Sequence, residues 1–157
     1  MALVEEVYLE GLENFTVVVD GTPTKVEVRK LCSIDVENLV EELTKHPSNY
    51  AWYATVLALF DAKKDDLAHQ IDVYEGELDI EIRRRVKGDK DAEKELKERF
   101  IKSQILTDAK HKVLSDEYLD TSKVVKRLTA LVKALETKRD MMVQIGARLR
   151  KEMDMNN

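Results

Sequence analysis

The chain has 157 residues and a net charge of −5, and 36% of its residues are charged whereas only 6% are aromatic. Five glycines and two prolines leave long stretches free of helix breakers, which favours long solvated helices over an all-β or α/β domain. Cys32 is the only cysteine, which excludes a disulfide within the chain, and no apolar run reaches the roughly 18 residues of a transmembrane helix. We therefore expect a cytoplasmic protein without a membrane partner.

The N-terminal region differs from the rest of the chain. Apolar side chains alternate through Phe15, Val17 and Val19, a turn-forming stretch follows at residues 20–23 (DGTP), and alternation resumes at Val26. This pattern predicts a β-hairpin over residues 14–30. A lone hairpin is only marginally stable in water, so it must pack on something else. We expect residues 1–32 to form a β-hairpin appendage and residues 33–157 to form a helical oligomerisation domain.

Four helices are expected after the hairpin. Asp35 is a plausible N-cap for a short helix over residues 36–45, and Pro47 ends this helix or begins the next. A long helix is predicted over residues 48–86. A third helix over residues 91–106 precedes Asp108, which could cap the last helix, although residues 91–153 could equally form one helix.

Both long helices carry apolar residues in steps of three and four. In the last helix this repeat runs from Leu114 to Met153 and predicts a helix with a coiled-coil-like seam along one side. Such a helix must lie against another long helix, of its own chain or of a neighbour. We expect an elongated hairpin of the two long helices, with two shorter helices, in a multi-helix or oligomeric core. The residues predicted to form the oligomer seam are Tyr53, Leu57, Phe60, Leu67, Ile71, Leu128, Leu135 and Met142.

Charge is unevenly distributed along the chain. The first 47 residues carry ten acidic and four basic side chains, whereas residues 121–157 carry four acidic and nine basic ones. Away from the seam, the last helix presents a basic stripe made of Lys123, Lys126, Arg127, Lys133, Arg148 and Lys151. A second basic cluster at the end of the first long helix contains Arg83, Arg84, Arg85 and Lys87. Rows of cations suit the phosphates of a nucleic acid, although an ordinary solvated helix face would look the same.

Motifs for catalysis are absent from the sequence. It contains no phosphate-binding glycine loop, no nucleophile elbow and no zinc-protease helix. Asp66 with His69, and Asp108 with His111, have the carboxylate-x-x-His spacing of dimetal helical bundles, but no inward carboxylates on two other helices accompany them. We predict neither an enzyme nor a cofactor or metal.

Two stretches resemble the phage recombination mediators of the UvsY type. Residues 43–48 (LTKHPS) resemble the Leu-x-Lys-His-x-Ser stretch at the start of that family's long helix. Residues 62–76 then match its Lys-Lys, Leu, apolar-Asp-x-Tyr-x-Gly pattern at the same spacing, with Lys63 and Lys64 as the basic pair. The resemblance covers roughly residues 36–150, and its last part is shared by any long heptad helix.

The resemblance implies an all-helical, ring-forming protein that works in DNA recombination and repair. Such a bacteriophage protein would act in the host cytoplasm. It would bind single-stranded DNA, contact a single-strand-binding protein and help to load a RecA-like recombinase, without being an enzyme. Two features depart from the family. Further basic residues are missing at 68–70 (AHQ), and the hairpin has no counterpart. The alternative is a structural helical ring protein or assembly chaperone of a phage particle, at the neck, tail or head.

Overall fold

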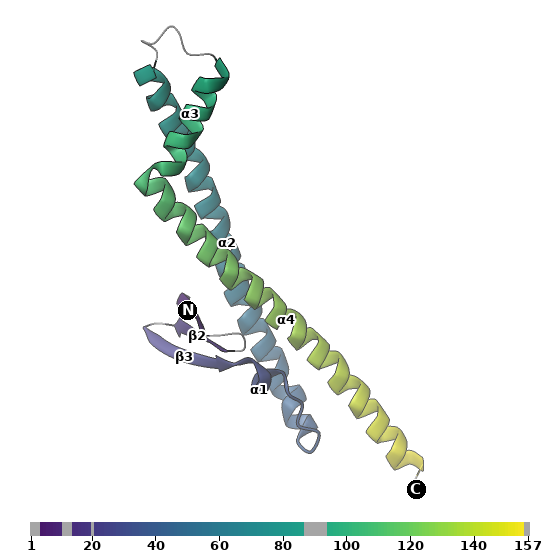
Figure 1. Ribbon diagram of the computed structural model, residues 1–157. Coiled ribbons are helices and arrows are strands. Elements are labelled where there is room, and N and C mark those ends of the chain that lie inside the picture. The colour runs from purple at the N-terminus through teal and green to yellow at the C-terminus, as the bar shows by residue number, and fades with distance from the viewer. Residues whose placement is uncertain (1–3, 11–13, 20, 87–93, 156–157) are drawn as a thin grey trace. The chain divides into compact units, whose positions relative to one another are not determined.

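The computed structural model describes residues 4–10, 14–19, 21–86 and 94–155 (Figure 1). The chain divides into two compact units. The first unit combines residues 1–60 with residues 124–157, and the second consists of residues 61–123. Two long helices, α2 (Leu39–Val86) and α4 (Ala109–Met155), contribute to both units. Two long helices packed together are as predicted, and two shorter helices accompany them among the described residues, although the first of these was expected elsewhere in the chain.

The first unit begins with a three-stranded antiparallel sheet. Its strands are β1 (Val4–Glu10), β2 (Asn14–Val19) and β3 (Thr22–Glu27), in that order. Gly21, with φ of 72°, occupies the turn between β2 and β3, and Phe15 pairs with Val26 across them. The predicted hairpin is therefore confirmed over residues 14–27, but residues 28–30 belong to a helix instead, and β1 was not predicted. A register shift between Val4 and Glu6 interrupts the alternation by which a strand is recognised in sequence.

The chain then forms α1 (Val28–Cys32), a turn and α2. The carboxylate of Asp35 accepts hydrogen bonds from the backbone N–H groups of Glu37 (3.1 Å) and Asn38 (3.3 Å), so it caps the turn that leads into α2. The predicted short helix over residues 36–45 and the break at Pro47 are wrong, because α2 passes through Pro47 without interruption. The helix continues because Leu39 and His46 before the proline, and Tyr53 and Val56 after it, are all buried.

Replacement of Pro47 should stabilise the protein. Pro47 has no N–H to donate to the carbonyl of Leu43, and its ring crowds that carbonyl, at a cost of about 3 kcal/mol in a helix interior. Since Pro47 is exposed, Pro47→Ala should raise the free energy of unfolding by about 1–3 kcal/mol in a urea titration. Ser48, the exposed neighbour of Pro47, provides the control. Ser48→Ala should change the free energy of unfolding by less than about 0.5 kcal/mol. A loss of stability in Pro47→Ala would contradict a continuous α2.

The core of the first unit joins the sheet to both long helices. Figure 1 shows the sheet and α1 beside the first part of α2. The core lies between them and α4, and its buried side chains are Phe15, Val17 and Val26 from the sheet, Tyr53, Val56 and Phe60 from α2, and Val124, Leu128, Leu131 and Leu135 from α4. The sheet thus shares one core with the helices, and the predicted boundary after residue 32 does not coincide with the observed division of the chain.

The buried face of α4 differs in part from the predicted seam. Every second buried position is shifted by one residue from the predicted repeat. Leu128, Leu135 and Met142 are buried as predicted, at 1%, 0% and 0% exposure. Between them the buried residues are Leu131 and Lys138, whereas a step of four from Leu128 and from Leu135 leads to Val132 and Arg139. Residues 131 and 132 are both apolar and residues 138 and 139 are both basic. The pattern therefore could not distinguish the two registers.

The residues predicted to form an oligomer seam are already in contact within one chain. Tyr53, Phe60, Leu128 and Leu135 belong to the core of the first unit, and Leu57 packs against it half-buried. Met142 is buried in the same unit. In the second unit Leu67 is buried and Ile71 is half-buried. Burial inside the chain accounts for this apolar repeat without a second subunit.

The second unit packs the last part of α2 and the first part of α4 with α3 (Lys94–Thr107). The predicted cap at Asp108 is confirmed, because its carboxylate accepts hydrogen bonds from the backbone N–H of His111 (2.9 Å) and from the hydroxyl of Tyr74 (3.0 Å). Residues 94–155 therefore form two helices. In the part of the chain that the structure describes, no helix is both long and apolar enough to cross a membrane.

Candidate nucleic-acid interface

Three lysines on α4 form the clearest cationic surface. Lys126, Lys133 and Lys151 are exposed and lie on the side of the helix opposite the buried residues Leu128 and Leu135. None of the three forms an ion pair with any residue in the described ranges. Lys126 and Lys133 are two helical turns apart, or about 10.5 Å along the axis. We call these three residues the α4 lysine face.

The other residues of the predicted basic stripe on α4 are less accessible to a phosphate group. Arg127 is half-buried, because it lies nearer the core-facing side of α4. Arg148 donates to Glu152 at 3.0 Å, one turn further along the same helix. Lys123, which belongs to the second unit, pairs with Asp120 at 2.8 Å. The six residues predicted from sequence thus reduce to three with no acidic neighbour in contact.

The basic pair suggested by the family resemblance is also neutralised. Lys63 pairs with Glu117 at 3.0 Å, which joins α2 to α4 within the second unit. Lys64 is 2.5 Å from Asp61 and 3.7 Å from Asp65, and this hydrogen-bonded pairing raises the pKa of Lys64. Both lysines therefore already form ion pairs with carboxylates in the free protein.

Two of the three described residues in the cluster at the end of α2 pair with acidic side chains. Arg83 makes two hydrogen bonds to Glu98 on α3, at 2.9 and 3.0 Å, and a third to Asp79 at 2.7 Å, and these raise its pKa. Arg85 pairs with Glu81. Arg84 is exposed and has no ion pair within the described ranges. Lys87 lies outside the described residues.

These ion pairs weaken the candidate interface without abolishing it. Exposed pairs are worth about 0–1 kcal/mol each, so a phosphate can replace the carboxylate at modest cost. Arg83 is the exception, because its two parallel hydrogen bonds to Glu98 fix both side chains. The first contacts with a polyanion are therefore expected from the α4 lysine face, with the exposed pairs as secondary contributors.

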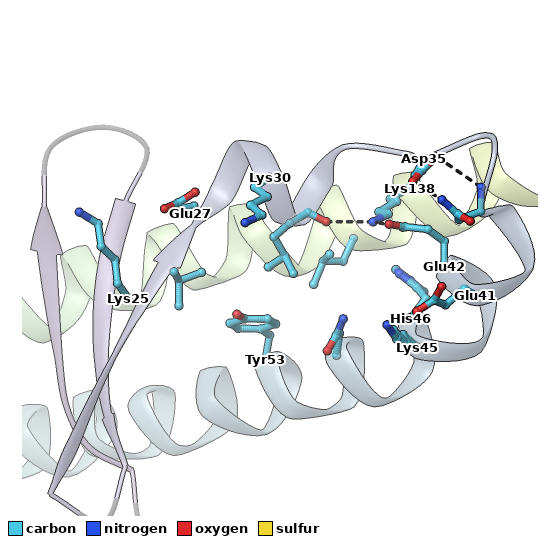
Figure 2. Close-up of a pocket in the computed structure, with 15 residues that line it drawn as sticks. Lys25, Glu27, Lys30, Asp35, Glu41, Glu42, Lys45, His46, Tyr53 and Lys138 are labelled. Atoms are coloured by element: carbon cyan, nitrogen blue, oxygen red, sulfur yellow. Dashed lines mark hydrogen bonds and ion pairs between the residues drawn. The ribbon is translucent and has the colours of Figure 1, made fainter.

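A buried polar cluster on the other side of α4 was missed by the sequence analysis. Lys138, at 8% exposure, donates to the carbonyl of Leu31 at 3.0 Å and pairs with Glu42 at 2.5 Å (Figure 2). His46 lies close by, at 6% exposure, and its Nε2 has no hydrogen-bond partner among the described residues. The spacing from Leu131 and Leu135 to Lys138 was the available signal, and it requires the corrected register.

The stability of the first unit should depend on pH through His46. Burial lowers the pKa of His46, and the nearby charges of Lys138 and Arg139 lower it further. Because the unfolded chain then binds the proton more tightly, the contribution of His46 is fully present above about pH 6.5 and is lost as the pH falls through the folded value. The free energy of unfolding should decrease between about pH 7 and pH 5.

Two variants separate His46 from the other titrating groups. His46→Gln should flatten this decrease, since glutamine does not titrate. His69→Gln changes an exposed histidine of α2 and should leave the decrease in the free energy of unfolding as in the unaltered protein. Identical pH profiles for His46→Gln and the unaltered protein would contradict the assignment.

The two carboxylate-x-x-His pairs have separate structural contacts. Asp66 accepts a hydrogen bond from Gln70 at 2.7 Å, and His69 is exposed. Asp108 caps α4, and His111 contacts Glu75 through Nε2 at 2.7 Å. A search of the described residues finds no group of three or more His, Cys, Asp or Glu side chains placed to hold a metal ion.

The chain was compared with models of known protein families, with curated proteins and with solved structures. None of the three comparisons gives a match.

Proposed function

We propose that this protein binds single-stranded DNA and acts as a recombination mediator rather than as an enzyme. The observation that carries the proposal is the α4 lysine face, three exposed and unpaired cations opposite a buried apolar seam. The resemblance of residues 43–48 and 62–76 to the mediators of the UvsY type supports the same function. A helix with a cationic exposed face can follow a strand without reading its bases.

Three lysines per chain give too few phosphate contacts for tight binding by a monomer. We therefore include self-assembly, ring-like as in the resembling family, which repeats the α4 lysine face along one strand. Exposed apolar side chains support a contact between copies. Leu149 and Met153 continue the apolar repeat of α4 at 39% and 68% exposure.

The mediator role adds two protein partners. In this proposal, wrapping the strand on several lysine faces displaces the single-strand-binding protein and frees DNA for a RecA-like recombinase. The acidic start of the chain supplies a surface for the recombinase, whose DNA-binding side is expected to be basic. Asp35, Glu37 and Glu41 are exposed in this region.

The mediator role is tested by recombinase loading. A RecA-type recombinase is added to a long single strand covered with single-strand-binding protein, and its DNA-dependent ATP hydrolysis is followed with and without this protein. The expected result is a shorter lag with this protein and no effect on bare DNA. An unchanged lag, despite measurable DNA binding, would reject the mediator role and leave a DNA-binding protein.

A second candidate is a structural ring protein or assembly chaperone of a phage particle. It is favoured by ion pairs with acidic side chains at half of the twelve predicted DNA-binding cations, namely Lys63, Lys64, Arg83, Arg85, Lys123 and Arg148. Such a protein would use its exposed apolar side chains for packing and would need no nucleic acid. Detection of the protein in purified virions by mass spectrometry, with no affinity for DNA, would favour this candidate.

A further inference from the structure

The first unit contains a cavity of about 510 Å³ that the DNA-binding proposal does not use. Residues at the end of β3, α1, the turn before α2, the start of α2, and α4 line it (Figure 2). Val26, Leu31 and Leu135 supply apolar wall, and the remaining lining is mostly polar. The volume is within the range of about 300–1,000 Å³ that is usual for small-molecule sites.

The buried lysine of this cavity has unused hydrogen-bonding capacity. An ammonium group has three N–H donors. Lys138 donates to the carbonyl of Leu31 and to the carboxylate of Glu42, and its third N–H has no acceptor among the described residues. The side chain of Lys138 is only 9% exposed, so an acceptor inside the cavity is its natural remaining partner.

Other polar groups in the lining also lack partners. The buried Nε2 of His46 has none in the described part of the chain, and a buried polar atom without a partner is unfavourable. No hydrogen bond from the hydroxyl of Tyr53, or from the ammonium group of Lys30, to a described residue is found. In Figure 2 Lys30, Tyr53, His46 and Lys138 surround the same space from α1, α2 and α4.

Most of the acidic side chains in the lining are already engaged. Glu42 pairs with Lys138, and Glu41 pairs with Lys45. The two carboxylate oxygens of Asp35 accept hydrogen bonds from Asn38 and Glu37. Glu27 lines the cavity too, from the end of β3. Among the described acidic side chains of the lining, Glu27 is thus the one without a partner, whereas Lys30 and Lys138 retain unused donors.

We propose that this cavity binds a small oxyanion, a phosphate or carboxylate group held by Lys30, Lys138 and the hydroxyl of Tyr53. The same group gives the unpartnered Nε2 of His46 an acceptor when that nitrogen carries its proton. The apolar wall of Val26, Leu31 and Leu135 accommodates the uncharged part of a larger ligand. This site is independent of the α4 lysine face, whose members do not line the cavity.

Calorimetric titration of the full chain tests the proposal, with inorganic phosphate and acetate in separate experiments at constant ionic strength. The expected result is saturable binding of at least one of them, with one site per chain. Binding should also shift the NMR signals of the His46 ring, because a nearby negative charge raises the pKa of a histidine. Phosphate alone would indicate a phosphorylated ligand, and acetate alone would indicate a carboxylate ligand.

Lys30→Gln should weaken binding about tenfold, the effect of losing one charge-assisted hydrogen bond. Lys30 is exposed, so this variant should fold normally. Lys133→Gln removes a cation of the α4 lysine face and should leave anion binding unchanged. The proposal is overturned if neither anion shows saturable binding. It is also overturned if Lys30→Gln and Lys133→Gln lose affinity for the anion equally, because that would mean general attraction to the charged surface. Tyr53→Phe keeps the ring and should also weaken binding.

The two proposals fail independently in these experiments. If the cavity proposal alone is wrong, DNA binding remains and depends on Lys133. If the DNA proposal alone is wrong, anion binding remains and depends on Lys30.

Discussion

Leu135→Ala is expected to lower the free energy of unfolding by about 2–5 kcal/mol, the range for large-to-small substitutions at fully buried positions. Leu135 is 0% exposed and belongs to the core that joins the sheet to α2 and α4. Its removal therefore leaves a space bounded by several elements at once. Urea unfolding followed by circular dichroism measures the effect.

The matched control lies further along the same helix. Leu149 is 39% exposed, so Leu149→Ala should change the free energy of unfolding by less than about 1 kcal/mol. Under the self-assembly proposal, Leu149→Ala should instead reduce oligomer size in analytical ultracentrifugation. Equal destabilisation by the two substitutions would contradict the observed packing of α4, because one residue is in the core and the other is at the surface.

Charge reversal of the α4 lysine face should produce the largest effect on DNA binding. Lys126→Glu, Lys133→Glu and Lys151→Glu together replace three cations per chain with three anions. Single-stranded DNA releases about 0.7 counterions per neutralised phosphate, so the slope of log K against log salt should fall by roughly 2 for each chain that contacts the strand. The affinity at about 50 mM salt should decrease by at least 100-fold.

A second triple variant tests whether ion-paired cations matter equally. Lys63→Glu, Lys64→Glu and Lys123→Glu change the same net charge, but these lysines pair with acidic side chains in the second unit. A smaller loss of affinity is expected from them. If both triple variants bind DNA as the unaltered protein does, the basic residues form only a solvated face.

The sequence was sufficient for elements whose signals are local. Alternation and a turn predicted the β2–β3 hairpin, and the long apolar repeats predicted α2 and α4. Asp108 was recognisable as a cap because a short polar side chain before a helix accepts its free N–H groups. Each of these signals depends only on neighbouring residues.

The failures arose where tertiary packing decides between local alternatives. A proline usually ends a helix, but α2 continues through Pro47 because residues on both sides of it are buried. The choice between Lys138 and Arg139 for the buried position depends on Glu42 and the carbonyl of Leu31, which are distant in sequence. Ion pairs such as Lys63 with Glu117 likewise could not be read from the spacing of the basic residues.

The proposed binding of single-stranded DNA through many phosphate contacts can be measured by fluorescence anisotropy. A labelled single-stranded oligonucleotide is titrated with the protein at about 50 mM and at about 200 mM salt. We expect tight binding at the lower salt concentration and a loss of affinity of about 100-fold or more at the higher one, because several lysine faces act together. Absence of binding at both concentrations would rule out the proposed DNA binding and would favour the structural role in a phage particle.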